Sequence, residues 1–556
     1  MIGRLLNLVR SHPPVPSGPT GQLEDDMARA IALVNQKLPE AALPILQRQV
    51  ARQPESRESW LWLARALIEA RRFEEAEEAF FEAIALAAEP ALKSIIRGEL
   101  ARARGDTESA VNELRQALGA RPADPECANQ LGLALEAAGR DAEAESLYRQ
   151  ALDQHPRARQ LLGNLANLLS RSHGIDAAAP VFEEGLRRHP RDAVLRYNYA
   201  TNCAAANRKE KAVELLRDAL ACDANLRPAR INLALELFLL GRMREACTAF
   251  EARWDCVASL RDRYTLPPEL QWRGADLTGK TILLWAEQGL GDSMQMVRYI
   301  AMLPSLGPRQ IHVRAPRSLL RLFSCIPGIA SLVAEEDSTP LVPFDLHCPF
   351  MSLPLAFDTT LDSIPATLPY LRAEAAEVAR WKCALPARPG HVRAGLVWRS
   401  DPQGDVWSAD ARATKSIPLA QFDTMRRVEQ VTWISLQLGA GRDEIRNTPA
   451  GLDLFDPTAG IRDFADTAAI VEQLDLVVTV DTAVAHLAAA MGKPVLMLLK
   501  FSSGLFWLLE REDSPWYPGG LRIVRQSKPG DWREVIDRGA DLVEQFIRRR
   551  TLWDKS

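Results

Sequence analysis

Small and large apolar residues recur every 34 residues along the N-terminal part of the chain. Steps of 34 residues in both directions from Ala144 reach further alanines, namely Ala42, Ala76, Ala110, Ala178, Ala212 and Ala246. A second small residue stands 12 positions before each alanine, and a large apolar residue stands 4 positions after it. Small residues let two helices approach closely, and the large residue fills the space beside that contact. The period therefore predicts stacked helix–turn–helix units that bury their apolar faces against one another.

Seven such units run without a break through residues 23–256, and this region resembles the tetratricopeptide repeat family. The resemblance implies a concave groove that binds a peptide, an extended segment or another protein; a spacer or a dimerisation element is the alternative. Asparagines on or near the first helices could hold a ligand's backbone through their paired donors and acceptors, or could lie on a solvated face. They are Asn129, Asn164, Asn167, Asn198 and Asn232.

After Trp254 the pattern changes to short apolar runs that are bounded by Gly and Pro and alternate with helical stretches. Strands that alternate with helices predict parallel sheets with crossover helices, here in two Rossmann-like lobes that face a cleft. The expected strands are 281–285, 310–314, 331–334 and 344–347 in the first lobe, and 393–398, 431–436, 475–480, 494–499 and 521–524 in the second.

The predicted domain organisation follows from these two patterns. It comprises a flexible N-terminus (1–22), seven repeats (23–256), a connector (257–270), a first Rossmann-like lobe on the acceptor side (271–372), an interlobe segment (373–392) and a second lobe with a C-terminal helix (393–556). The fold class is α plus α/β.

Composition narrows the function classes. The net charge of −4 over 556 residues does not suggest a nucleic-acid partner, which usually meets a basic field. No stretch approaches the roughly 18 consecutive apolar residues of a membrane span. The first residues lack the features of a secretory signal, and the eight scattered cysteines form no C-x-x-C pair, so we expect a cytoplasmic protein with reduced thiols.

Two strand–helix junctions carry candidate chemistry. In the first, a buried run leads through Gln288 into the turn Gly289-x-Gly291, and Asp292 follows at a helix start, either projecting into the cleft or serving as an N-cap. In the second, a buried strand ends at Val480, and the residues that follow open a helix whose N–H groups and dipole suit a phosphate. The candidate residues there are Asp481, Thr482, Ala483 and His486; capping and a structural histidine are the alternatives.

A third candidate is the basic loop after the strand that ends at Trp398. Arg412 or Lys415, beside Ser416, could neutralise a phosphate leaving group, although solvated loop charges are the alternative.

Taken together, these segments resemble the bacterial glycosyltransferases related to the heptosyltransferase family, which have the GT-B fold. The shared motifs are G-L-G-D at 289–292, K-S-I-P-L at 415–419, S-L-Q at 435–437, L-D-L-V-V-T-V-D-T-A-V-A-H-L-A at 474–488 and R-E-D-S-P-W-Y-P at 511–518. The resemblance covers roughly residues 268–530, and the D-T-x-x-x-H-L-A element is its most specific part.

The resemblance implies a nucleotide-activated sugar donor in the second lobe, with its phosphates near Thr482 and the Lys415–Ser416 loop. Gln437 and the Trp398 loop would lie near the nucleoside, and Asp292 matches the family's candidate general base. The helix start and basic side chains, rather than a metal, would stabilise the leaving phosphate, and the chain contains no Asp-x-Asp pair. No cofactor is implied, because the nucleotide sugar is a substrate.

The sequence departs from the family pattern at Ser400, Asp401 and Phe506. Its layout resembles that of protein O-glycosyltransferases whose repeats present a protein acceptor, above all the flagellin-modifying enzymes, which often use a CMP-activated nonulosonic acid. A heptosyltransferase-like enzyme acting on lipopolysaccharide or another glycan is one alternative. A non-enzymatic repeat scaffold with a degenerate transferase fold is another.

Overall fold

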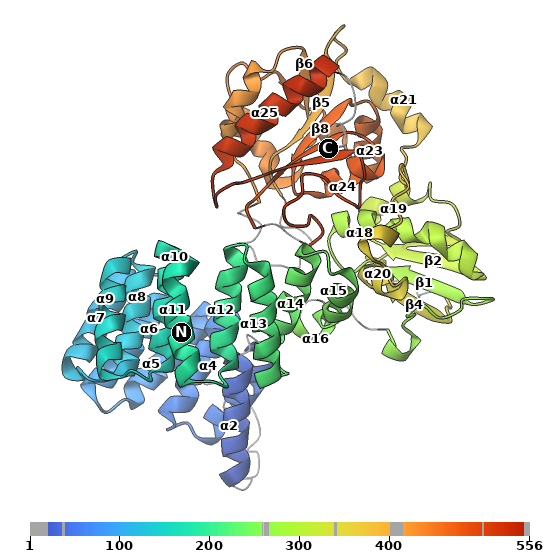
Figure 1. Ribbon diagram of the computed structural model, residues 1–556. Coiled ribbons are helices and arrows are strands. Elements are labelled where there is room, and N and C mark those ends of the chain that lie inside the picture. Colours follow the sequence, from blue (N-terminus) through green and yellow to red (C-terminus); the bar gives the residue numbers. More distant parts are fainter. Residues whose placement is uncertain are drawn as a thin grey trace. The chain divides into compact units, whose positions relative to one another are not determined.

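A computed structural model describes residues 20–35, 39–257, 260, 266–337, 342–400, 415–502 and 505–549 (Figure 1). The chain forms two compact units, Met1–Asn232 and Leu233–Ser556. The boundary between the units falls inside helix α14 (Arg227–Leu239). Among the described residues, no helix is long and apolar enough to cross a membrane.

The first unit is a series of antiparallel helix pairs, as the 34-residue period predicts (Figure 1). Its helices are α2 (Thr20–Asn35), α3 (Pro39–Arg52), α4 (Arg57–Glu69), α5 (Phe73–Leu86), α6 (Pro90–Ala103), α7 (Thr107–Ala120), α8 (Pro125–Ala137), α9 (Asp141–Gln154), α10 (Arg159–His173), α11 (Ile175–Arg188), α12 (Ala193–Ala205) and α13 (Lys209–Cys222). The periodic alanines lie on the second helix of each pair and are buried.

The pairing of small and large residues is confirmed by two glycines at the other small position. A Cβ added to Gly98 would lie 2.5 Å from Leu114 Cγ, and one added to Gly132 would lie 2.1 Å from Tyr148 Cε1. Leu114 and Tyr148 are the large residues one turn after the periodic alanines of the same units. The interval in the sequence is therefore an interval of packing, in which the backbone of one helix leaves room for the large side chain of its partner.

The asparagines of the first helices link neighbouring repeats. Asn164 donates to the side chain of Asn129 at 2.7 Å, and Asn202 donates to that of Asn167 at 2.8 Å. Asn232 donates to the Tyr197 hydroxyl at 3.3 Å. Asn129 is buried and the other asparagines are half-buried, so they do not lie on a fully solvated face.

The second unit contains two parallel sheets, so the predicted α plus α/β class is confirmed (Figure 1). The first sheet has the order β3-β2-β1-β4 and is formed by β1 (Thr281–Trp285), β2 (Gln310–Ala315), β3 (Ser331–Ala334) and β4 (Leu346–Pro349). The helices of this part are α15 (Met243–Phe250), α16 (Arg253–Cys256), η1 (Pro268–Leu270), α18 (Leu290–Met296), η2 (Val297–Leu306), α19 (Arg317–Phe323), η3 (Phe350–Ser352), α20 (Leu353–Ala356), η4 (Leu361–Ser363) and α21 (Ala375–Ala384).

The second sheet has the order β10-β9-β8-β5-β6-β7, and all its pairs are parallel. Its strands are β5 (Val392–Val397), β6 (Val431–Ser435), β7 (Leu454–Phe455), β8 (Leu476–Val480), β9 (Val495–Leu499) and β10 (Leu521–Arg525). The associated helices are η5 (Leu419–Arg427), η6 (Gly439–Asn447), η7 (Thr458–Gly460), α23 (Phe464–Glu472), α24 (Ala483–Ala490) and α25 (Trp532–Arg549). Among the described strands of this sheet, the two-residue edge strand β7 is the one that the apolar runs did not predict.

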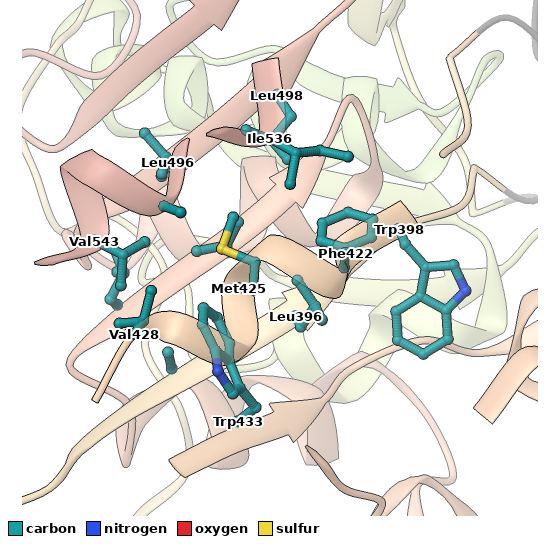
Figure 2. Close-up of a cluster of buried hydrophobic side chains, with 14 of the residues drawn as sticks. Leu396, Trp398, Phe422, Met425, Val428, Trp433, Leu496, Leu498, Ile536 and Val543 are labelled. Carbon is teal, nitrogen blue, oxygen red and sulfur yellow. The ribbon is translucent and has the colours of Figure 1, made fainter. Parts of the chain in front are cut away.

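One face of the second sheet is closed by η5 and α25. Figure 2 shows Phe422 and Met425 of η5 among Leu396, Leu496 and Leu498 of the strands, with Ile536 and Val543 of α25 completing the cluster. These side chains are almost completely buried. Burial of this kind stabilises by about 25 cal/mol per Å² of apolar surface, and it holds the strand ends in place for the site described next.

Each sheet has a point where the direction of its strand order reverses. In the second sheet it lies between β5 and β8, where Val397 is paired with Thr479. In the first sheet it lies between β1 and β4, where Trp285 is paired with Pro349. Ligands of open parallel sheets bind at such points, beyond the carboxyl ends of the strands. The loops after these four strands are therefore the first places to examine for function.

Candidate functional site

The turn after β1 is closed by Asp292. Helix α18 begins at Leu290, two residues earlier than the sequence predicts, and Gly289 is its N-cap. The Gly289 N–H donates to Asp292 Oδ2 at 3.1 Å. This bond reaches back across the first turn of the helix, so Asp292 has a capping contact, and the same bond fixes where its carboxylate lies.

The turn after β8 places Thr482 at the N-cap of α24. Thr482 has an extended backbone, with φ −140° and ψ 166°. Its hydroxyl lies 2.9 Å from that of Thr479 and makes no capping bond to the first turn of α24. The side chain of Thr482 therefore does not cover the amides of Ala483 and the next residue, which is the arrangement that an anion at a helix start requires.

The two predicted junctions meet at Gly291. A Cβ added to Gly291 would lie 2.7 Å from His486 Cδ2 and 3.3 Å from Ala483 Cα. Only a residue without a side chain lets α18 of the first lobe lie this close to α24 of the second. The G-L-G-D and D-T-A-V-A-H segments are therefore brought to one place, with Asp292 and Thr482 on adjoining helix starts.

Lys415 lies in the same place, through an ion pair with Asp481. Its Nζ is 2.9 Å from Asp481 Oδ2, and the Trp507 indole N–H donates to Asp481 Oδ1 at 2.9 Å. Burial alone would raise the pKa of Asp481, but Lys415 and these hydrogen bonds hold that pKa below its ordinary value. The structure thus joins two of the predicted site residues in a charged pair at the start of α24.

His486 is buried one turn into α24. Its Nδ1 lies 2.8 Å from the Tyr517 hydroxyl, and its ring lies 5.0 Å from that of Trp507. Burial lowers the pKa of His486 to about 4, against the opposing effect of Asp481. The imidazole is therefore neutral near pH 7, and it could offer a ligand a hydrogen bond but no positive charge.

This histidine should make the protein less stable as the pH falls from about 6.5 to about 4. Over that range the unfolded state takes up a proton that the folded state does not, so the free energy of unfolding decreases as the pH falls. Melting temperatures measured between about pH 4 and pH 8 should show the decline, and His486→Gln should flatten it. An equally steep decline in His486→Gln would assign the effect to other groups.

Gln437 fastens the end of β5 to the end of β6. Its Oε1 accepts from the Trp398 and Arg399 N–H groups, and its Nε2 donates to the Arg399 and Leu438 carbonyls. The indole of Trp398 lies in the apolar core, fully buried. Both residues therefore shape the loop where a nucleoside is predicted, and the predicted contact with the nucleoside remains a prediction.

The remaining predicted residues fall into three groups. The Ser416 hydroxyl accepts from the Ser400 N–H at 3.2 Å and so closes the loop above β5. Gln288 is buried, and its amide has no hydrogen-bond partner among the described residues. Arg412 and Asp401 lie outside the described residues.

Sequence reasoning missed two members of this surrounding. Tyr517 belongs to a segment that the family resemblance marked, but its contact with His486 joins distant parts of the chain. Glu287 is an acidic residue directly after a buried strand and before the glycine turn, and that position was the available signal. Phe506, a departure from the family pattern, is buried against Trp516 and Phe238. Among the described residues, no cluster of His, Cys, Asp or Glu is arranged to hold a metal ion.

Comparison with protein families agrees with this architecture. Tetratricopeptide repeat models match residues 33–97, 97–159 and 164–226. The model of glycosyltransferase family 9 (heptosyltransferase) matches residues 442–509, which include β8, α24 and β9. The matched segment thus contains Asp481, Thr482 and His486.

Individual relatives extend this picture. Protein FlbA of Caulobacter vibrioides is 29% identical over 334 residues, covering 56% of this chain and 54% of FlbA. The chain thus spans about half the length of that curated relative. Two solved structures are similar: the TPR protein TTC0263 of Thermus thermophilus (22% identity, 32% of this chain, 98% of that chain, TM-score 0.29) and MamA of Desulfovibrio magneticus (21%, 32%, 99%, 0.26).

Proposed function

We propose, for a chain that combines tetratricopeptide repeats with a glycosyltransferase family 9 segment, that it moves a sugar from a nucleotide-activated donor to Ser or Thr of a protein bound by the repeats. In its most specific form the donor is a CMP-activated nonulosonic acid, the acceptor is flagellin, and the catalytic domain is of the metal-independent GT-B type. The observation that carries the proposal is the contact of Gly291 with His486, which brings the first-lobe carboxylate beside the second-lobe helix start.

The chemistry assigned to these residues is a single group transfer. The acceptor oxygen forms a bond to the anomeric carbon of the sugar, the bond from that carbon to the phosphate oxygen breaks, and Asp292 takes the acceptor proton. The developing charge on the phosphate would be stabilised by the first turn of α24 and by Lys415. For Lys415 this role requires that it share its charge between Asp481 and the phosphate, since the two lie in contact without a ligand.

Recruitment of a protein acceptor is assigned to the first unit. The asparagine pairs that link successive repeats support this role, because each amide carries more donors and acceptors than one bond uses. An extended segment could hydrogen-bond to this row without displacing the packing between repeats. The resemblance in layout to flagellin-modifying enzymes supports the choice of flagellin.

Nucleotide binding is the direct test of the donor site. Titration of the purified protein with CMP, UDP, GDP and ADP should raise the melting temperature with one nucleotide, because a ligand that binds only the folded state stabilises it by about 2.7 kcal/mol at about 100 times its Kd. Thr482→Ala should lose most of this shift, whereas Thr448→Ala, which removes a hydroxyl bonded to the Ile445 carbonyl at the end of η6, should keep it.

Two outcomes would redirect the proposal. No response to any nucleotide would favour the scaffold role, in which the repeats alone carry the function. A nucleotide response together with altered lipopolysaccharide and unchanged protein glycosylation in a strain lacking the gene would favour a glycan acceptor, which the match to the heptosyltransferase family also supports.

A further inference from the structure

The reversal point of the first sheet is filled by a side chain from the end of the last repeat. Beyond β1 and β4 the chain continues to Glu287 on one side and to Ser352 on the other. Arg253 of α16 lies between them: its Nη2 donates to Glu287 Oε1 at 3.0 Å and to the Ser352 hydroxyl at 2.8 Å. In the second sheet the corresponding point is where the predicted donor site lies. In the first sheet, part of the space where a ligand would bind is taken by the protein's own guanidinium.

The contacts of Arg253 are those of a fixed group rather than of a surface charge. The residue is fully buried, and its Nη1 donates to Glu251 Oε1 at 2.6 Å and to the Phe250 carbonyl at 3.3 Å. Its guanidinium lies over the Trp254 ring, 4.3 Å from the centroid. Planar guanidinium groups hold carboxylates in a defined direction, so these bonds determine where the Glu287 carboxylate lies.

Glu287 passes this constraint on to the glycine turn. It is fully buried, and its Oε1 also accepts from the Met351 N–H at 3.1 Å. Burial raises the pKa of Glu287 to about 7, an effect that the charge of Arg253 opposes. The residues that follow, Gln288 to Asp292, form the turn that faces α24. A shift of Glu287 would therefore move the start of the turn that carries Asp292.

We propose that Arg253, a buried charge at the end of the seventh repeat, is a positioning residue that holds the Glu287–Asp292 turn against the second lobe. Helices α15 and α16 are then a working part of the transferase unit, and they tie the end of the repeat region to the turn with the predicted base. The effect on sugar transfer rests on the proposed function; the effect on the position of the turn does not.

Amide hydrogen exchange of the full-length protein tests the position directly. Arg253→Lys keeps the charge but cannot make the same set of bonds, and it should speed exchange in residues 286–296 and 349–353. Exchange in α24 and the nucleotide-induced thermal shift should stay unchanged. Arg314→Lys, which alters another first-lobe arginine that donates to the Glu335 carbonyl, should change none of these readouts. Unaltered exchange in residues 286–296 of Arg253→Lys would overturn the proposal.

A double variant separates positioning from stability. Arg253→Met leaves the Glu287 carboxyl buried without its cation, and Glu287→Gln in the same chain removes that charge. We expect the double variant to recover much of the melting temperature that Arg253→Met loses, while sugar transfer stays about tenfold to a hundredfold below wild type, because a misplaced turn misaligns the reacting groups. Recovery of transfer together with the melting temperature would show that Arg253 only stabilises the fold.

The same experiments distinguish failure of this inference from failure of the proposed function. If the wild type transfers no sugar from any donor but Arg253→Lys still speeds exchange in the turn, the proposed function fails and the positioning role stands. If transfer is present and neither exchange nor transfer responds to Arg253→Lys, the positioning role fails and the proposed function stands.

Discussion

Replacement of Asp292 by asparagine should lower the rate of sugar transfer by about a hundredfold to ten-thousandfold, the usual contribution of a general base. The carboxylate is held by the Gly289 N–H at the start of α18, and this helix start adjoins that of α24. Asparagine keeps the shape and an oxygen that can accept the Gly289 bond, but it cannot take a proton from the acceptor. The loss should therefore appear in kcat at an almost unchanged melting temperature.

A control for this variant is available in the same lobe. Asp276 also caps a turn, through the Thr278 hydroxyl at 2.8 Å and the Thr278 N–H at 3.3 Å. Asp276→Asn should leave transfer within a factor of about two of wild type, since it removes a carboxylate with a capping role only. Full transfer by Asp292→Asn would leave Asp292 as an N-cap and assign the base to another residue.

Deletion of residues 1–256 should unfold the remaining α/β region, whereas deletion of residues 1–226 should leave it folded. The second compact unit begins at Leu233, inside α14. Phe238 at the end of that helix lies 5.2 Å from Phe506, and the Leu509 N–H donates to the Leu239 carbonyl at 3.0 Å. The longer deletion removes these contacts and Arg253, leaving Glu287 buried without its cation.

The size of the expected effect follows from the buried ion pair. Removing one partner of a buried pair costs about 3–5 kcal/mol. Domains are stable by only about 5–15 kcal/mol, so this loss and that of the aromatic contacts are enough to unfold the unit. Thermal unfolding of the two truncated proteins measures the difference directly. Equal melting temperatures would show that α14–α16 adds nothing to the α/β region.

The shorter truncation also tests recruitment by the repeats. A protein without residues 1–226 should keep its nucleotide-induced thermal shift and lose transfer to the protein acceptor. Undiminished transfer to that protein would remove the recruitment role from the repeats, and the glycan-directed alternative would then be the stronger one.

The helix pairs and most strands were predictable because their signals are local and periodic. The period of 34 residues marks a contact between neighbouring repeats, so every unit repeats the same packing in the sequence. Buried parallel strands form continuous apolar runs, and eight of the ten strands in the described part of the chain were placed to within one residue at each end or better. The predicted strand 344–347 lies two residues before β4 (Leu346–Pro349), and the two-residue edge strand β7 is too short to form a run. The predicted domain limits themselves stay predictions.

The candidate site was predictable in part. The residues at the ends of β1 and β8 could be named, because parallel sheets collect their ligands at that edge. Their partners could not, since each contact joins segments far apart in the chain. Lys415 pairs with Asp481, His486 contacts Tyr517, and Gln437 is used up by backbone groups of the β5 loop. The sequence suggested a free cation, a ligand-binding histidine and a nucleoside contact for these three residues.

The order of apolar and polar residues within a few turns of chain is enough to establish the repeat period, the two parallel sheets and the identity of the residues at the strand ends. Three other features follow from how distant segments pack: Gly291 meets His486, Phe506 is a core residue, and Arg253 fills the reversal point of the first sheet. Burial and the pairing of charges depend on which of these segments come together, and no local pattern records that choice.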